Sequence, residues 1–407
     1  MRILVLTNQY PPHSLGGYAL SCQSIVELFR HRGHDVYVLT SDARLPGVEE
    51  DPAEVGFGVH RDLYFWFREL GREPKMPRFP LRERWKHERW NQRTLWNALT
   101  VWRPDVVSVW EMGAMSLTML TLLERAGIPT VLNLHDYWPH YALNWDPWLR
   151  VFDQRPWIRR LAAPLRMETG APDLSNATVN VISRSLRDKL ASDGRWRFPE
   201  AEVIPFGIDP RLFPVVEPEP RPWNWRLLYV GRLELLKGLR TLALAMRKLP
   251  PTASLEVVGM GDPAIPAMMK EIIGEPGASE RLGFSTCPRS ELAARYQDAD
   301  VLVFPSEWDE PFGLAPLEAM ACGVPVVATG TGGSGEYLRD GENCLLFPPR
   351  DSDRLAAAVQ RLAGEPDLRK TIVLEGSRTA ERYSLDGVAK ELEDLHLAAA
   401  GLTSKST

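Results

Sequence analysis

The chain alternates short strand-like runs with longer helix-like stretches, and this alternation limits the folds open to it. The first run, ILVLT at residues 3–7, is followed by Gly16-Gly17 and a helical pattern that continues to about Arg30. Further strand-like runs in this half lie at residues 35–41, 105–110, 129–134 and 177–183. Strands that alternate with helix-length segments are typical of βαβ units, so the pattern predicts a parallel sheet covered by helices.

The same alternation restarts after a proline-rich stretch, residues 205–223, which we interpret as an interdomain linker. The second series of strand-like runs lies at residues 226–231, 254–259, 300–306, 324–329 and 344–349. We therefore predict an α/β protein with two Rossmann-like domains, residues 1–210 and 224–383, and a final helix over about 384–400. Ligands of open α/β sheets bind at the carboxyl ends of the strands, so we expect a deep cleft where two such domains face each other.

Composition and charge exclude several classes of protein. The 407 residues are 44% hydrophobic and 25% charged, which is typical of a soluble globular chain of two or three domains. A net charge of -5 offers no broad positive field for nucleic acid. The sequence has no run of about 18 apolar residues, so it predicts no membrane span. Four scattered cysteines without a CxxC pair favour a reducing compartment, the cytoplasm, and argue against a zinc site or disulfides.

Two motifs in the first half stand where a ligand-binding loop is expected. LGGYA places Gly16 and Gly17 between the first strand and the first helix, where glycine permits close backbone approach and helix-start N–H groups favour anions. A tight turn is the alternative, because the GxGxxG spacing of a dinucleotide site is missing. His135 follows an apolar strand and stands beside Asp136, so it is either a cleft residue or a structural histidine.

A basic motif opens the second series. In YVGRLELLKGL, residues 229–239, Arg232 and Lys237 follow a strand and are five positions apart across a turn. Arginine and lysine at the carboxyl end of a strand are suited to bind a diphosphate together, and a solvated charged face is the alternative.

A pair of glutamates follows the strand at 300–306, with Glu310 in a loop and Glu318 on a helix whose first turn accommodates Pro316. A carboxylate accepts hydrogen bonds from both hydroxyls of a vicinal diol, so Glu318 is suited to a ribose and Glu310 to a hexose. Backbone N–H groups around Gly313 would meet phosphate or sugar oxygens between them. The alternative for Glu318 is an acid that stabilises the helix dipole.

Together these motifs resemble the retaining, nucleotide-sugar-dependent glycosyltransferases of family four, which have the two-domain GT-B fold. The resemblance covers residues 1–40, 103–136 and 176–209 and nearly all of 226–349. Its most specific segments are RGHDVYVLT, RPDVVSVW, VIPFGID, GRLELLKG, EPFGLAPLEAMACGVPVVAT and GGSGEYLRDGEN. Phe206 stands where the family often has asparagine, and Cys344 where it often has asparagine-glycine. Neither departure removes an implied ligand contact.

The resemblance implies that the first domain binds the acceptor, that the second binds the donor, and that the final helix crosses back to the first. Glu318 would bind the ribose, Phe284 would lie in the segment that reads the base, and His135 would lie by the donor sugar. The residues implied in donor binding are Gly16, Gly17, Arg232, Lys237, Phe284, Glu310, Phe312, Gly313, Leu314 and Glu318. Those implied in catalysis are His135, Glu310, Arg232 and Lys237.

The implied reaction moves a hexose from a UDP-, GDP- or ADP-sugar to a hydroxyl acceptor, with no cofactor and no metal. Arg232, Lys237 and helix N-termini would stabilise the negative charge that develops on the leaving diphosphate. No DxD element stands where a metal-dependent transferase would need one. DAD at 298–300 precedes a strand, and we interpret it as structural. Retention of configuration would follow from same-face attack, with the leaving phosphate helping to deprotonate the acceptor.

Three other functions are alternatives to this one. A nucleotide-sugar 2-epimerase on the same fold would turn over donor without an acceptor, and a non-catalytic subunit would bind donor without turnover. The basic pair and the glutamate pair favour the transferase over both. A nicotinamide oxidoreductase would need a GxGxxG element followed by an acidic residue, and neither domain has one.

Residues 61–102 and 137–170 do not match the family well. From 61 to 100 there are ten Lys/Arg against five Asp/Glu, interleaved with tryptophan. Such segments suit an acceptor pocket for a small molecule, a glycan or a lipid-linked sugar, or a peripheral contact with the inner membrane face. Amphipathic helices that merely pack on the first domain are the alternative.

Overall fold

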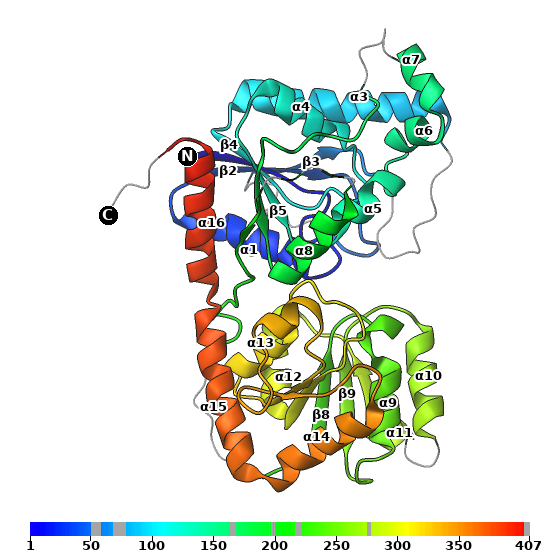
Figure 1. Cartoon of the computed structure of the whole chain (residues 1–407), viewed down its shortest axis with the longest axis vertical. Helices are drawn as coiled ribbons and strands as arrows, with labels where there is room; N and C mark the ends of the chain where they lie inside the picture. Colours follow the sequence, from blue (N-terminus) through cyan, green and yellow to red (C-terminus); the bar gives the residue numbers. More distant parts are fainter. Residues whose placement is uncertain are drawn as a thin grey trace. The chain divides into compact units, whose positions relative to one another are not determined.

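The computed structural model describes residues 1–49, 58–67, 79–162, 168–194, 196, 198, 200–215, 222–274 and 278–402 (Figure 1). The chain divides into two compact units. Unit 1 consists of Met1–Ile204 with Ala389–Thr407, and unit 2 is Pro205–Val388. Both units have the α/β architecture predicted from the sequence.

Unit 1 is built on a seven-stranded sheet with the order β3-β2-β1-β4-β5-β6-β7. Every neighbouring pair is parallel. The strands are β1 (Arg2–Leu6), β2 (Asp35–Ser41), β3 (Val59–Leu63), β4 (Val106–Val109), β5 (Thr130–Leu134), β6 (Thr178–Val181) and β7 (Glu202–Val203). All four residues of the central strand β4 are buried, as expected for a parallel sheet that is covered on both faces.

Helices cover this sheet (Figure 1). They are α1 (Gly17–His31), α3 (Leu81–Asn97), the π-helix η1 (Ala98–Trp102), α4 (Thr118–Ala126), α5 (Trp138–Trp145), α6 (Leu149–Gln154), η2 (Pro156–Ile158), α7 (Arg159–Ala162), α8 (Arg184–Asp193) and the end of α16 (Leu385–Ala399). Glycine ends α4, because Gly127 takes the left-handed conformation at its C-cap with a φ of 62°.

Unit 2 repeats the topology with a six-stranded parallel sheet of order β10-β9-β8-β11-β12-β13. Its strands are β8 (Arg226–Val230), β9 (Ser254–Val258), β10 (Leu282–Ser285), β11 (Val301–Phe304), β12 (Val326–Ala328) and β13 (Leu345–Leu346). Its helices are η4 (Leu235–Lys237), α9 (Leu239–Met246), α10 (Ala264–Ile273), α11 (Ala278–Arg281), η5 (Arg289–Glu291), α12 (Leu292–Asp298), α13 (Leu314–Ala321), η6 (Gly332–Glu336), α14 (Ser352–Gly364), α15 (Pro366–Arg382) and the start of α16.

Each sheet has a point where the strand order reverses. In unit 1 it lies between β1 and β4, and in unit 2 between β8 and β11. Ligands of doubly wound sheets bind outside the carboxyl ends of the strands at such a point. The loops after these four strands are therefore where a site is expected.

The boundary between the units lies at 204/205, so the described part of the proline-rich stretch belongs to unit 2. Ile208 donates its backbone N–H to Tyr383 O at 2.7 Å and accepts from Leu385 N at 2.9 Å, which attaches this stretch to the start of α16. The helix α16 begins in unit 2, and unit 1 includes it from Ala389 on. Of the helices described, none is both long and apolar enough to cross a bilayer.

Candidate active site

The loops after β8 and β11 approach each other closely at Gly238. This glycine has a φ of 74°, and a Cβ built on it would lie 1.8 Å from the carbonyl oxygen of Pro305. Only glycine permits both the left-handed conformation and this approach. The close contact positions Lys237, the preceding residue, beside the loop that carries Glu310.

Lys237 and Glu310 form a partly buried ion pair at the reversal point of unit 2. The Lys237 Nζ lies 2.6 Å from Glu310 Oε1, and the two side chains are 14% and 6% exposed. The Ser306 hydroxyl donates to the same carboxylate oxygen at 2.6 Å. The Lys237 ammonium also lies 5.3 Å from the centre of the Trp308 ring. Two residues that the sequence assigned to donor chemistry are thus in direct contact.

Arg232 does not join this cluster. Its side chain is 59% exposed and pairs with Glu234 at 2.8 Å, whereas Lys237 pairs with Glu310. The expected convergence of the two cations is therefore not present in this structure. A rotation of the exposed Arg232 side chain would be needed to bring it about.

The helix α13 begins at the predicted position. Gly313 is its N-cap with a φ of 86°, Leu314 is its first residue and Pro316 lies in its first turn. The Phe312 ring is buried among aromatic rings, with centroids 5.3 Å from Tyr337 and 5.7 Å from Tyr383. Only the backbone of Phe312 is therefore available to a ligand at this helix start.

Glu318 is buried and already engaged on both carboxylate oxygens. Arg289 donates to Oε1 at 2.7 Å and the Tyr296 hydroxyl donates to Oε2 at 2.9 Å. Burial, and then the charge of Glu318, raise the pKa of Tyr296. A carboxylate has about four acceptor positions, so two remain for other hydroxyls. Arg289 and Tyr296 were missed from the sequence, because no spacing links them to Glu318.

The segment predicted to read the base forms β10. Phe284 is half-buried there and packs against the core of unit 2, and its neighbour Gly283 is exposed. Asp300, the last residue of the DAD element, accepts from the backbone N–H groups of Asn224 and Arg226, both at 2.9 Å. Asp300 therefore has a structural role, as predicted for this element. Among the described residues no group of three or more His, Cys, Asp and Glu side chains is arranged to hold a metal ion.

In unit 1 the glycine pair stands at the start of α1. Gly16 is the N-cap with a φ of 87°, and Gly17 is the first helical residue. Both are exposed, and a Cβ on either would meet no atom within 4 Å. Because a helix start presents unsatisfied backbone N–H groups, this open position is suited to an anionic group.

His135 lies at the carboxyl end of β5 between two aromatic rings. Its ring centroid is 4.8 Å from that of Trp110 and 5.1 Å from that of Tyr18. Burial lowers the pKa of His135 to about 3, so its imidazole is neutral at physiological pH. A neutral imidazole has one donor and one acceptor nitrogen, which suits contact with sugar hydroxyls.

Two acidic residues lie near His135: Asp136, which the sequence analysis named, and Glu111, which it missed. The Tyr141 hydroxyl lies 3.0 Å from Asp136 Oδ2 and 3.3 Å from Glu111 Oε1. Burial and these two carboxylates raise the pKa of Tyr141. Glu111 follows β4, so the carboxyl ends of β4 and β5 together carry an acidic and aromatic cluster.

A buried polar network lies behind this cluster. Ser108 of β4 has its hydroxyl oxygen 3.0 Å from Trp110 Nε1, 3.1 Å from Asn133 Nδ2 and 2.8 Å from His396 Nε2. The first two nitrogens donate, so the Ser108 proton is left for His396. His396 Nδ1 then donates to Leu392 O at 2.6 Å. The end of α16 is therefore hydrogen-bonded to β4, and Trp110, which contacts His135, directly follows this strand.

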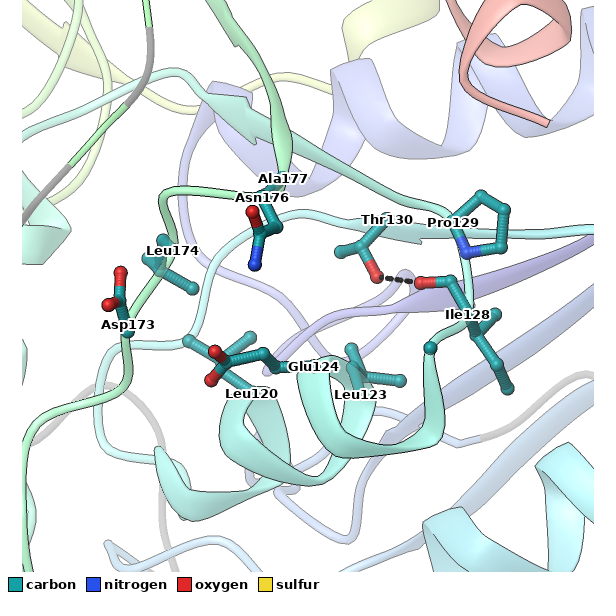
Figure 2. A pocket seen from close by; sticks show the side chains of 11 residues that line it. Leu120, Leu123, Glu124, Ile128, Pro129, Thr130, Asp173, Leu174, Asn176 and Ala177 are labelled. Atoms are coloured by element: carbon teal, nitrogen blue, oxygen red, sulfur yellow. Dashed lines mark hydrogen bonds between the residues drawn. The ribbon is translucent and has the colours of Figure 1, made fainter. Parts of the chain in front are cut away.

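Figure 2 shows a surface pocket of unit 1 that lies away from these residues. It has a volume of about 220 Å³ and lies at the amino ends of β5 and β6. Its charged lining residues are both acidic, Glu124 and Asp173. Such a lining does not suit a diphosphate, so this pocket is not part of the candidate site.

Comparison with known proteins covers nearly the whole chain. Residues 15–212 match the family model described as Glycosyltransferase Family 4, and residues 218–378 match the model described as Glycosyl transferases group 1. The glycogen synthase of Mycobacterium tuberculosis is 28% identical over 398 residues, which span 90% of this chain and 87% of that protein.

Solved structures share the fold. Sucrose-phosphate synthase from Thermosynechococcus elongatus has a TM-score of 0.70 and 22% identity, with 98% of both chains covered. Anabaena HepE, in a complex with UDP-glucose, has a TM-score of 0.67 and 20% identity, with 97% of this chain and 98% of that chain covered.

The two doubly wound units and both family matches define a glycosyltransferase of the GT-B fold class. The chain contains both of the domains that such enzymes have, each matched over most of its length. It belongs to glycosyltransferase family 4.

Proposed function

We propose that this enzyme transfers a hexose from a nucleoside diphosphate sugar to a hydroxyl acceptor, with retention of configuration and without a metal ion. The observation that carries the proposal is the Lys237–Glu310–Ser306 cluster at the reversal point of unit 2. A cation in contact with a carboxylate suits a ligand with a diphosphate next to a sugar.

In this proposal the ammonium of Lys237 contacts the diphosphate while Glu310 accepts from a hydroxyl of the sugar. Glu318 uses its remaining acceptor positions for the ribose, and Arg289 and Tyr296 hold its carboxylate in place. Gly313 and Leu314 lie at the start of α13, where backbone N–H groups favour phosphate oxygens. Arg232 turns from Glu234 to the diphosphate once the donor is bound.

The reaction breaks the bond between the sugar C1 and the β-phosphate oxygen. The acceptor oxygen forms the new bond to C1 from the same face, and its proton passes to the departing phosphate oxygen. Lys237, Arg232 and the helix starts stabilise the charge that accumulates on the diphosphate. The neutral His135 contacts the donor sugar, and the N–H groups at Gly16 and Gly17 face the phosphate or the sugar.

We further propose that the enzyme works in the cytoplasm. Its four cysteines are free thiols, and Cys22, Cys322 and Cys344 are buried. Free thiols persist in a reducing compartment. The nucleotide-sugar donor of the proposed reaction would also have to be present in that compartment.

The proposal is tested with Lys237→Ala. Loss of a charged hydrogen bond should weaken binding of UDP, measured by isothermal titration calorimetry, by roughly 1.5–3 kcal/mol. Lys248→Ala is the matched control, because Lys248 pairs with Asp353 on the surface of the same unit at 2.6 Å. UDP affinity that is the same in both variants and in the unmodified protein would count against the role of Lys237.

The donor base is identified by thermal shift with UDP-, GDP- and ADP-glucose, because a ligand stabilises the fold by RT ln(1 + [L]/Kd). Product analysis with donor alone separates the transferase from an epimerase. Epimerised sugar formed without acceptor would contradict the proposed reaction, whereas slow hydrolysis would not.

A further inference from the structure

The helix α3 of unit 1 has an unusual outer face. Its inner stripe, which includes Glu88, Asn91 and Leu95, is buried. Its outer face exposes three tryptophans, Trp85, Trp90 and Trp96, which are 40%, 58% and 48% exposed. Tryptophan is seldom left this open in a soluble protein, because burying its large ring is favourable.

Four basic residues share this outer face: Arg82, Lys86, Arg89 and Arg93. All four are exposed, and none forms an ion pair within the part of the chain that the structure describes. The acid on the same face is Glu83. The outer face is therefore cationic as well as aromatic.

The order of these residues around the helix is regular. At about 100° per residue, Trp85 and Trp96 fall at one edge of the exposed arc and Trp90 at the other. The four basic residues fall between these edges. The 17 residues of α3 give the face a length of about 25 Å. We call this surface, residues 82–96 of α3, the basic–aromatic face.

A second segment of the same composition follows α6. Trp157 is 65% exposed, and Arg155, Arg159 and Arg160 around it are exposed too. Arg84 donates to Pro147 O at 2.8 Å and so attaches the start of α3 to the chain that enters α6. Figure 1 shows α6 and α7 near the end of α3 where that helix begins.

We propose that the basic–aromatic face, with residues 155–160 beside it, docks the enzyme on a bilayer that contains anionic lipids. Indole rings favour the interface between water and hydrocarbon, and arginine and lysine attract anionic headgroups. Nucleic acid is less well matched, because the chain as a whole carries a net charge of -5. The proposal does not depend on the donor or on the reaction.

The test is co-sedimentation of the full chain with vesicles made of equal parts of phosphatidylglycerol and phosphatidylcholine. The enzyme should pellet with these vesicles, should not pellet with phosphatidylcholine alone, and should be released by high salt. Arg89→Gln with Arg93→Gln should lower partitioning by about 30-fold, since each charge near an anionic surface contributes about fivefold.

The matched control changes two exposed arginines of unit 2, Arg361→Gln with Arg378→Gln, which already pair with Glu365 and Glu375. It should bind like the unmodified protein. If both double variants lose vesicle binding equally, binding depends on the net charge of the protein and not on this face. That result would overturn the assignment of the face. Failure of the unmodified protein to pellet with anionic vesicles would overturn it as well.

A second measurement uses brominated phosphatidylcholine, which quenches tryptophans that enter the bilayer. In mixed anionic vesicles, Trp85→Phe with Trp96→Phe should lose a share of the quenching and keep the unfolding temperature. No quenching of the unmodified protein would contradict insertion of these rings. Tight binding of a DNA oligonucleotide at physiological salt, without vesicle binding, would assign the face to nucleic acid instead.

Discussion

The Ser108 hydroxyl shows how one residue determines the protonation of another. It accepts from Trp110 and Asn133, so its single proton is donated to His396 Nε2. His396 must then be neutral with its own proton on Nδ1. Burial agrees with this, because it lowers the pKa of His396 to about 4. Protonation would place a second N–H against an oxygen that has no acceptor position left.

The pH dependence of stability follows from this pKa. An unfolded histidine binds a proton near pH 6.5, whereas folded His396 does so only near pH 4. Its contribution to stability is therefore complete above about pH 6.5 and is lost as the pH falls towards 4. In urea unfolding, His396→Asn should reduce the slope of stability against pH by about 1.4 kcal/mol per pH unit over that window. An equal slope in both proteins would show that His396 does not titrate as described.

A test of Glu318 needs to separate two roles. Its carboxylate is held by Arg289 and Tyr296, and its remaining acceptor positions are proposed for the ribose. Glu318→Gln should lower affinity for UDP in calorimetry by roughly 1–3 kcal/mol and spare inorganic diphosphate. Equal loss for both ligands would mean that the change acts through the fold around α13.

Some contacts between individual residues could be predicted from the sequence, and others could not. Lys237 and Glu310 could be predicted as neighbours in function, because both follow strands that meet at the reversal point of one parallel sheet. Arg289 could not be paired with Glu318, since it lies 29 positions away on an element with no motif of its own. The roles of Gly16, Gly17, His135 and Phe284 toward a donor stay predictions.

At the scale of elements, the ten strand-like runs each contain a strand, whereas β3, β7 and β10 were not predicted. The sequence of β3, VHRDL, has three polar residues of five, so it lacks the apolar run of a central strand. The strand β7 has two residues. These three strands are the two edges of the first sheet and one edge of the second, where burial constrains the sequence least.

The loop that ends η4 allows a direct test of backbone geometry. Gly238→Ala should destabilise unit 2, because its Cβ would collide with Pro305 O as well as strain a φ of 74°. Gly127→Ala is the matched control, since Gly127 has a φ of 62° and no atom within 4 Å of its Cβ position. Strain alone should cost the control about 1 kcal/mol, and Gly238→Ala should cost clearly more in thermal unfolding. Equal costs would show that the two loops separate easily.

At the scale of the whole molecule, the final helix belongs to both units. The sequence predicted a helix over about 384–400, and α16 spans Leu385–Ala399. The linker prediction came from proline content, and composition does not reveal that Ile208 is hydrogen-bonded to Tyr383 and Leu385. Backbone pairing between distant segments therefore attaches the start of the proline-rich stretch to the rest of unit 2.

A chain that ends at Val388 should lose stability mainly in unit 1. It lacks the buried Leu392, Leu395 and His396, and two buried leucines alone are worth more than ~4 kcal/mol. Tryptophan fluorescence follows this unit, because 11 of the 14 tryptophans lie before residue 205. The urea midpoint of that fluorescence should fall well below that of a control chain ending at Leu402. Equal midpoints would contradict the assignment of the helix end to unit 1.

The helix α16 also has a consequence for biosynthesis. A polypeptide emerges from the ribosome with its amino end first. The residues of unit 2 form one continuous segment that ends at Val388. Unit 1 instead lacks part of its structure until the turn of α16 that contains His396 has been translated. Until then Ser108 cannot form its hydrogen bond with the His396 imidazole. The half of the protein that is made first is therefore the half that completes its folding last.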